Sequence, residues 1–402
     1  MGRRLLAVSN LYPPHALGGF ERDCAESVER ISALGNQTIV LTGTTSGRDR
    51  ETDRIFRTLP LHTSSPHPFG LPRELAWHVR SRAAAAVAVR RSVPDVVSLW
   101  GTSWISRAAL ATVAKSAPTV AVVYDYGLLD HLVAQPIPRR EGWRRYYDGV
   151  AGRGFHAVGG DGPLTKPGRF VFCSEAIRRT YEERLGPLPG AVIPHGVSVP
   201  EVRPLFSIRE DRLRVGAVGR LVPEKGFDVL IEAAMELATS GDGDLVEIEI
   251  RGTAPEPAHH AELLSRAETA RRSGAHVSIE PALAGPDDVA KWMLTKDCIA
   301  MTSVWEEPGG LVAMEAMAAG RAVVSTAAGG LAELVEDGVN AIVVPKRDAR
   351  ALASALRLLA RDPVLAERIA AAGFQRVRLH HRIEDRGPEL DEFLLSTAGA
   401  QR

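Results

Sequence analysis

Cysteine is scarce in this sequence, and its distribution argues against a disulfide framework or a structural zinc site. The three cysteines lie far apart among 402 residues and none forms a Cys-x-x-Cys pair, which favours a reducing compartment. Long apolar runs are also lacking: none approaches the ~20 residues of a membrane-spanning helix, and the pair Arg3-Arg4 precedes only a short apolar stretch. We therefore expect a cytoplasmic protein without a signal peptide or a membrane span.

The chain also has no net charge, because 49 Lys and Arg side chains balance 49 Asp and Glu side chains. The two halves differ, since residues 1–200 have an excess of basic side chains and residues 201–402 an excess of acidic ones. A basic first half suits an anionic acceptor or a membrane surface, and it suits an ordinary solvated face equally well. No nucleic-acid partner is expected.

The chain is longer than one hydrophobic core usually supports, so its length predicts two domains. Short apolar runs alternate with helical patterns in the first half, and the alternation starts again after the proline-rich stretch 193–206. Such alternation is typical of a parallel sheet covered by helices. In the second half, helices are expected at 227–238, 261–273, 287–295, 310–319, 331–336 and 349–361. The predicted fold class is α/β, with two Rossmann-like domains and a cleft between them.

One acid-rich stretch, WEEPGGLVAMEAMAAG at 305–320, joins the end of an expected strand to a helix. Glycines let a ligand approach the backbone, and the first amides of a helix are unpaired donors that suit a phosphate group. Glu307 lies outside the helix and can accept hydrogen bonds from hydroxyls, whereas Glu315 lies inside it and suits a vicinal diol such as ribose. An acid at a helix start and an interior acid paired with arginine explain the same spacing without a ligand. Glu306 is expected to be only solvated.

A second stretch, GAVGRLVPEKGFDVLIEAA, places Arg220 directly after a strand and Lys225 in a glycine-bounded loop before a helix. Two cations so placed can clamp a diphosphate and offset its charge as it leaves. Together with the Gly-Gly helix start, this pattern indicates a site for a nucleotide-diphosphate-sugar.

With these two stretches, the sequence resembles the retaining glycosyltransferases of family 4, which have the GT-B fold. The resemblance extends from YPPHALGGFE through VFCSEAIRRTYEERL, VIPHGVSV and GRLVPEKGFDVLIEAA to the acid-rich stretch and the residues after it. The family pattern E-P-F-G-L-V-x-x-E reads here from Glu307 to Glu315, with Gly309 in place of the phenylalanine. The resemblance implies an acceptor-binding domain at 1–200, a donor-binding domain at 201–378, and a C-terminal helix within 379–402 that returns to the first domain.

The resemblance also implies roles for individual residues. Glu307 contacts the donor sugar, Glu315 holds the ribose, and Arg220 with Lys225 binds the diphosphate. The nucleobase rests near Arg251-Gly252 and 281–283. The donor phosphates are further held by the amides of Gly309, Gly310, Leu311 and Val312, and by the glycine loop Gly18-Gly19 of the first domain.

Relatives often have a His-Asp pair where this chain has Tyr124 and Asp125. A tyrosine there can donate a hydrogen bond, but its usual pKa near 10 makes it a poor base at neutral pH. Two alternatives stay open: His131 reaches the site instead, or Tyr124 only packs at a strand end.

The acceptor side offers two aromatic candidates, Trp100 and Trp104, which flank a short loop at a strand end. They stack on a sugar or pack in the core, and packing is the stronger expectation. The segment RREGWRRYYDG at 139–149 mixes arginines with aromatics. It is either a peripheral contact with an anionic membrane or an ordinary surface helix.

No cofactor or metal is expected, because the only D-x-D, Asp242-Gly243-Asp244, lies in a turn composition. The family mechanism is front-face attack with retention, in which the leaving diphosphate helps take the acceptor proton. The Arg- and Ala-rich composition of the sequence is compatible with a high-GC bacterium. We therefore predict a bacterial glycosyltransferase, monomeric or homodimeric, that acts on a hydroxyl of a natural product or an envelope glycan or lipid. The alternatives are a non-catalytic sugar-nucleotide-binding protein and a sugar-nucleotide 2-epimerase.

Overall fold

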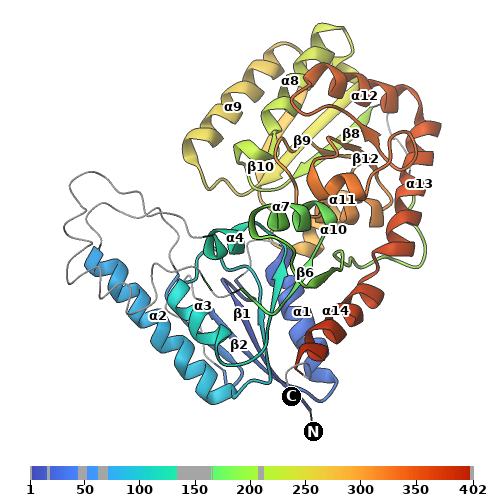
Figure 1. Cartoon of the computed structure of the whole chain (residues 1–402). Coiled ribbons are helices and arrows are strands. Elements are labelled where there is room, and N and C mark those ends of the chain that lie inside the picture. The colour runs from blue at the N-terminus through green and yellow to red at the C-terminus, as the bar shows by residue number, and fades with distance from the viewer. Residues whose placement is uncertain are drawn as a thin grey trace. The chain divides into compact units, whose positions relative to one another are not determined.

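The computed structural model describes residues 2–15, 19–43, 52–61, 71–133, 164, 166–206 and 212–398 (Figure 1). The chain divides into two compact units. The first combines Met1–Ile193 with Gly387–Arg402, and the second is Pro194–Arg386.

The first unit is built on a sheet of seven parallel strands in the order β3-β2-β1-β4-β5-β6-β7. Its strands are β1 (Arg4–Ser9), β2 (Gln37–Gly43), β3 (Ile55–Leu59), β4 (Val96–Leu99), β5 (Thr119–Val123), β6 (Arg169–Phe172) and β7 (Gly190–Val192). Its helices are α1 (Gly19–Ala33), α2 (Leu71–Ser92), α3 (Arg107–Ala114), α4 (Gly127–Leu132), α7 (Glu175–Leu185) and most of α14 (Ile383–Thr397). Because both faces of the sheet are covered, its central strands are almost wholly apolar and buried.

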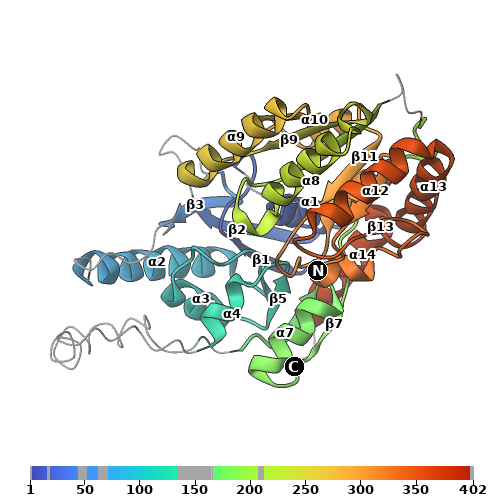
Figure 2. The ribbon, with the colours of Figure 1, turned by 90° about the horizontal axis from the view of Figure 1, so that it is seen from above.

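Helices α2 and α3 lie on one face of this sheet, and α1 and α14 lie on the other (Figures 1 and 2). The last helix enters the core of the first unit through Leu390 and Leu394. Its buried Asp391 accepts hydrogen bonds from Ser27 and Arg30 of α1, the latter at 2.8 Å. A charged hydrogen-bond pair therefore fixes the register of α14 on α1.

The second unit is built on a sheet of six parallel strands in the order β10-β9-β8-β11-β12-β13. Its strands are β8 (Leu213–Val218), β9 (Val246–Gly252), β10 (His276–Pro281), β11 (Cys298–Met301), β12 (Ala322–Ser325) and β13 (Ile342–Val343). Its α-helices are α8 (Phe227–Thr239), α9 (Pro257–Arg272), α10 (Pro286–Met293), α11 (Leu311–Ala318), α12 (Ala349–Arg361) and α13 (Pro363–His380). Short 3-10 turns occur at Pro223–Lys225, Gly243–Leu245 and Gly329–Glu333.

Two apolar clusters fill the two faces of this second sheet. Helices α8, α9 and α12 pack on one face over Val215 and Ile248. Helices α10 and α11 pack on the other over Ile299 and Val323. Strand side chains alternate between the faces. Strands β8, β11, β12 and β13 therefore contribute to both clusters, whereas β9 and β10 contribute only to the first.

Most helices expected in this unit are present, with small shifts at their ends. The helix at 349–361 has the expected bounds, since Asp348 caps it through a hydrogen bond from the Ala351 amide at 2.9 Å. The helix expected at 331–336 is wrong: the segment forms the short 3-10 turn Gly329–Glu333. Gly329 has φ +60°, which breaks a regular helix entry at this point.

Candidate active site

Both sheets have the strand order in which ligands bind at a topological switch point, outside the carboxyl ends of the two central strands. In the second sheet these strands are β8 and β11, paired from Cys298 opposite Val215. The loop after β8 carries Arg220 and Lys225, and the loop after β11 leads to Glu307. Motifs about eighty residues apart in the sequence therefore lie at one edge of one sheet.

These two loops are bound to each other by their backbones. Thr302 donates its hydroxyl to the Lys225 carbonyl at 2.8 Å, and the Val304 amide donates to the Glu224 carbonyl at 2.9 Å. Gly226 has φ +64°, and a β-carbon there would lie 2.2 Å from the Thr302 carbonyl oxygen. Only glycine fits so close an approach, so the loop geometry depends on this residue.

The Lys225 ammonium lies 2.6 Å from the Glu307 carboxylate and 5.9 Å from the centre of the Trp305 ring. Ser303 also donates a hydrogen bond to the same carboxylate. The Glu307 side chain is only 8% exposed, whereas that of Lys225 is 20% exposed. The cation thus faces solvent more than the acid does and is the group that an incoming anion meets.

The protonation state of Glu307 follows from two opposed effects. Burial acts to raise its pKa, while the charge and hydrogen bond of Lys225 and hydrogen bonds from Ser303 and Trp305 act to lower it. The lowering effects win, so the pKa of Glu307 lies below its usual value. Glu307 is therefore a carboxylate at neutral pH and can accept, but not donate, hydrogen bonds.

Helix α11 begins beside this ion pair. Gly310 precedes it with φ +75° and provides no side-chain cap. Because the first amides of an α-helix have no intrahelical partner, this end presents donors at the positive end of the helix dipole. Gly309 and Gly310 are buried, while Leu311, Val312 and Glu315 are half-buried. The expected phosphate-binding geometry is thus compatible with the backbone at this position.

A second glycine pair, Gly329-Gly330, also contacts Glu307, and the sequence patterns did not predict it. The Gly330 amide donates to the Glu307 carbonyl at 2.7 Å. A β-carbon on Gly329 would lie 2.5 Å from that same carbonyl oxygen. The pair follows strand β12 in the sequence AAGGL, and this glycine pair after a buried strand was the available signal.

Arg220 and Gly252 also lie at this edge. The Arg220 side chain is exposed, and among the described residues it forms no ion pair or hydrogen bond. Gly252 lies against Gly219, the residue that precedes Arg220. A β-carbon added to Gly252 would be 1.7 Å from the Gly219 carbonyl oxygen. The Gly219 amide donates to the Arg251 carbonyl at 3.0 Å. The close contact at Gly252 thus positions the loop that carries Arg220.

Glu306, in contrast, points to solvent and pairs with Lys346. Glu306 is therefore an exposed acid with an ion pair of its own, and not the solely solvated side chain that the sequence predicts.

In the first unit, Trp100 and Tyr124 lie in the core. Their rings meet edge to face at a centroid distance of 5.9 Å, and the Trp100 indole donates to Ser98 at 2.9 Å. Trp100 is 2% exposed and Tyr124 is 8% exposed. Burial raises the pKa of Tyr124 well above its usual value, so its phenol keeps its proton. The packing alternative therefore describes both side chains, and neither presents an open ring face within this unit.

Asp125 lies two residues before Gly127, the first residue of the short helix α4. Its carboxylate accepts a hydrogen bond from the Gly127 amide at 2.9 Å, and its carbonyl accepts one from the Tyr181 hydroxyl at 3.0 Å. These contacts give Asp125 a structural task at a strand end.

His131 and Trp104 are half-buried at the carboxyl edge of the first sheet. His131 Nε2 lies 3.0 Å from the Thr102 carbonyl, which can only accept, so Nε2 carries the ring proton. Burial lowers the pKa of His131 to about 4, and the ring is neutral at pH 7. The Trp104 amide donates to Asn10 at 3.0 Å. Asn10 follows β1 and Thr102 follows β4, so both groups lie at the switch point of this sheet.

Two expectations fall wholly or partly outside the described residues. Gly18 lies outside them, while Gly19 is the first residue of α1. The arginine-aromatic segment 139–149 also lies outside.

Within the described parts of the chain, no group of three or more His, Cys, Asp or Glu side chains is placed to hold a metal ion. Asp242 pairs with Arg357 and Arg361, and Asp244 pairs with Arg212 and His276. No described helix is long and apolar enough to cross a membrane.

Comparison with known proteins identifies the family to which the chain belongs. Residues 17–200 match the model of glycosyltransferase family 4, and residues 199–376 match the model of glycosyl transferases group 1. Glycogen synthase of Mycobacterium tuberculosis is 29% identical over 395 residues, covering 93% of this chain and 90% of that protein. D-inositol 3-phosphate glycosyltransferase of Kribbella flavida is 33% identical over 180 residues, or 44% of this chain and 42% of its own length.

Solved structures agree with the fold. Sucrose-phosphate synthase from Thermosynechococcus elongatus superimposes with a TM-score of 0.74 at 19% identity, covering 99% of this chain and 100% of that one. Anabaena HepE in complex with UDP and glucose gives a TM-score of 0.69 at 19% identity, covering 98% and 100%. Since the two family models together span almost the whole chain, the protein belongs to the glycosyltransferases of family 4, which have the GT-B fold.

Proposed function

We propose that this enzyme transfers a sugar from a nucleotide-diphosphate-sugar to a hydroxyl of an acceptor, with retention of the anomeric configuration. The observation that carries the proposal is the Lys225–Glu307 pair at the switch point of the second sheet, next to the unpaired amides of α11. This arrangement puts a cation, a hydrogen-bond acceptor and helix-end donors at one edge. A sugar diphosphate needs all three.

In the proposed complex the second unit binds the donor. Lys225 and Arg220 offset the charge of the diphosphate, and the amides from Gly309 to Val312 hold its distal phosphate. Glu307 accepts hydrogen bonds from sugar hydroxyls, and Glu315 accepts them from the ribose diol. Gly18-Gly19 of the first unit also contributes to the phosphates. HepE, a structural neighbour, was solved with UDP-glucose, which supports a nucleotide-sugar donor.

In the proposed mechanism, electrostatic stabilisation of the leaving diphosphate lowers the barrier, and the diphosphate helps take the acceptor proton on the same face of the sugar. The proposal needs no metal. The first unit takes the acceptor, with the half-buried His131 and Trp104 as the candidates that remain at the carboxyl edge of its sheet. An acceptor from natural-product tailoring or envelope-glycan assembly is proposed, together with a cytoplasmic site of action.

One observation favours a second candidate function. Tyr124 stands where relatives often have histidine, and its side chain is buried with its proton retained. This favours a sugar-nucleotide-binding protein that does not transfer the sugar.

A screen of nucleotide-sugars by thermal shift, followed by turnover with hydroxyl acceptors, separates the two functions. The proposal expects a donor that raises the melting temperature by mass action and is consumed only when an acceptor is present. NMR of the product then reports the anomeric configuration. Donor binding without any transfer supports the second candidate, and acceptor-independent conversion of the sugar supports a 2-epimerase.

A further inference from the structure

The turn after strand β12 is bound to the segment that carries Glu307. Strand β12 ends at Ser325, beside the end of β11, and Thr326 follows it. The Thr326 hydroxyl donates a hydrogen bond to the Ser303 carbonyl at 2.7 Å. Further along the same turn, the Gly330 amide donates to the Glu307 carbonyl at 2.7 Å. The turn therefore holds both ends of the short segment from Ser303 to Glu307.

This turn has an uncommon backbone conformation at Ala327. Its φ of +48° lies in the left-handed region, which residues with a β-carbon seldom adopt. The Ala327 amide donates to the Ser325 hydroxyl at 3.0 Å. Such residues persist where surrounding contacts hold them, and they cluster at functional sites. The hydrogen bonds of Thr326 and Gly330, on either side of Ala327, are contacts of this kind.

Ser303 extends this contact to the Glu307 side chain. The Ser303 hydroxyl donates to Oε1 of Glu307, the same oxygen that lies 2.6 Å from the Lys225 ammonium. The Met301 carbonyl, 3.4 Å from the Thr326 hydroxyl, already accepts the Thr326 amide at 3.0 Å. Carbonyls and ionised carboxylates only accept, so Thr326 donates to the Ser303 backbone and Ser303 donates to Glu307. Two buried hydroxyls in series thus connect the turn to the carboxylate.

The Ser303 hydrogen bond matters most when a donor is bound. In the proposed complex Lys225 turns to the diphosphate, so Glu307 loses the charged partner that the loop after β8 provides. The adjacent Glu306 is exposed and pairs with Lys346. Glu307 is buried, and a buried carboxylate stays ionised only while hydrogen bonds or an opposite charge stabilise it. In that complex the Ser303 hydroxyl remains as such a partner.

We propose that Thr326 is a positioning residue of the donor-sugar site. Its hydroxyl fixes the backbone of Ser303, and Ser303 in turn holds the Glu307 carboxylate toward the sugar hydroxyls. This inference rests on the proposed function, because that function assigns the sugar contact to Glu307. The Thr326 hydroxyl should therefore affect binding of the sugar, and not binding of the nucleoside diphosphate to which the sugar is attached.

The first test compares ligands that differ only in the sugar. Isothermal titration calorimetry measures the wild-type dissociation constants of UDP-glucose and UDP, GDP-mannose and GDP, and ADP-glucose and ADP, and the tightest pair is used for the variants. Thr326→Val keeps the shape of the side chain and removes its hydroxyl. We expect at least about a threefold loss of affinity for the nucleotide-sugar and an affinity for the nucleoside diphosphate within about twofold of wild type.

Thr326→Ser keeps the hydroxyl and is expected to restore the affinity for the nucleotide-sugar. Thr269→Val is the matched control, because the Thr269 hydroxyl also donates to a backbone carbonyl, that of Ser265 at 3.0 Å, but lies on the exposed side of α9. It should keep both affinities. The melting temperature of each variant shows whether it is folded. If Thr326→Val does not fold, Ser303→Ala removes the next hydroxyl of the series and takes its place.

The second test needs no donor. Carbon NMR of protein labelled at the glutamate carboxyl carbons follows the ionisation of Glu307, whose signal is identified by its absence in Glu307→Gln. Ser303→Ala removes a hydrogen bond to the charged form, so the pKa of Glu307 should rise. Thr326→Val should raise this pKa by a smaller amount, and Thr269→Val should leave it unchanged.

Equal loss of both ligands in Thr326→Val would show a general structural role and overturn the inference. Wild-type affinity for the nucleotide-sugar together with an unchanged pKa of Glu307 would overturn it too, as would a loss that Thr326→Ser does not restore. Failure of the wild type to bind any of the nucleotide-sugars contradicts the proposed function instead. The NMR titration then still decides whether Thr326 acts on Glu307.

Discussion

Lys225 and Glu307 form an ion pair of 2.6 Å across the loops that follow β8 and β11. Each partner is assigned to a different part of the donor, the cation to the diphosphate and the acid to the sugar. The contact with Lys225 lowers the pKa of Glu307, which keeps that carboxylate ionised. When the donor binds, Lys225 exchanges the Glu307 carboxylate for the diphosphate. This exchange costs less free energy than bringing two unpaired charged side chains into position.

We predict that Lys225→Ala lowers kcat by at least about a hundredfold, because the leaving diphosphate loses its fixed cation. Glu307 also loses its charged partner while remaining buried, so we expect the free energy of unfolding to fall by about 3 kcal/mol. Steady-state kinetics and urea unfolding measure the two effects.

Lys346→Ala is the matched control for this variant, since Lys346 pairs with the neighbouring but exposed Glu306. An exposed ion pair contributes about 0–1 kcal/mol, so both activity and stability should stay close to wild type. Near-wild-type turnover of Lys225→Ala at saturating donor would remove Lys225 from the reaction.

Gly252→Ala tests the contact that positions the Arg220 loop. The added β-carbon would lie 1.7 Å from the Gly219 carbonyl oxygen, so the backbone before Arg220 must move. We expect at least a tenfold fall in kcat/KM, since a displacement of about 1 Å is enough to cost far more. Gly285→Ala is the control, because its β-carbon meets nothing within 4 Å. Equal kinetics for the two variants would show that this contact does not affect the site.

How far the sequence predicted the site can be judged from these residues. Alternating strands and helices place Arg220, Lys225 and Glu307 after neighbouring central strands, so their meeting follows from topology. The ion pair itself does not follow, because motif spacing gives no side-chain direction. The contact of Gly329 with Glu307 was not predicted, because a glycine after a strand is also an ordinary turn signal.

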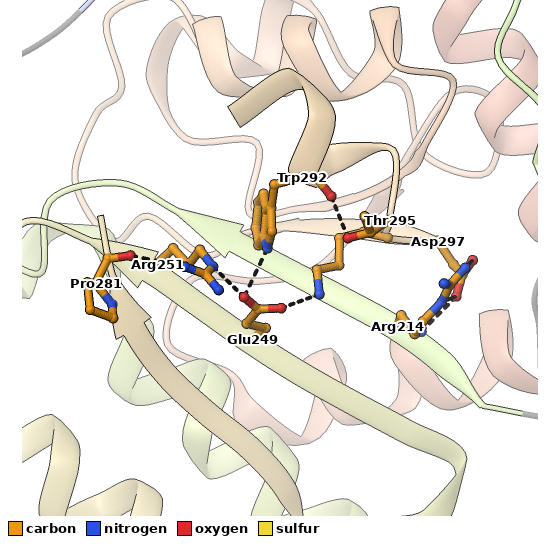
Figure 3. A network of polar contacts seen from close by, with 8 residues as sticks. Arg214, Glu249, Arg251, Pro281, Trp292, Thr295 and Asp297 are labelled. Carbon is orange, nitrogen blue, oxygen red and sulfur yellow. Dashed lines mark hydrogen bonds and ion pairs between the residues drawn. The ribbon is translucent and has the colours of Figure 1, made fainter. Parts of the chain in front are cut away.

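The same limit applies to the interior of the sheets. Alternating charge in VEIEIRG gives no sign that Glu249 faces Trp292 (Figure 3) and Lys296. Helix α10 and the segment between α10 and β11 contribute these partners, and both are more than forty residues away in the sequence. Trp100 and Tyr124 are buried because the ends of their strands still lie under helices that pack on the sheet. The local sequence does not show how far along a strand these helices extend.

We predict that excess EDTA leaves turnover unchanged. The D-x-D carboxylates Asp242 and Asp244 are engaged with arginines and a histidine, and their turn is far along the chain from Glu307. In the proposed mechanism, Lys225 and Arg220 supply the positive charge that a metal provides in other transferases. Activity measured before and after chelation, with Mg²⁺ added back, checks this. Loss of activity on chelation and its recovery with Mg²⁺ would show that the cationic side chains of the protein are insufficient for turnover.

We predict that His131 makes the free energy of unfolding depend on pH. Its pKa falls to about 4 in the folded chain, against a usual value of 6.5, so the unfolded state binds more protons between these values. Its contribution to stability is therefore complete above pH 6.5 and is lost as the pH falls toward 4. Between pH 7.5 and 5.5 this loss amounts to about 1 kcal/mol.

His131→Gln removes a titrating group and should make the free energy of unfolding less dependent on pH in that window. The remaining slope then includes His381, whose pKa is also lowered to about 4 by burial. Urea unfolding of both proteins at pH 7.5 and 5.5 gives the difference directly. If the two proteins lose the same stability on acidification, His131 is not held neutral by burial.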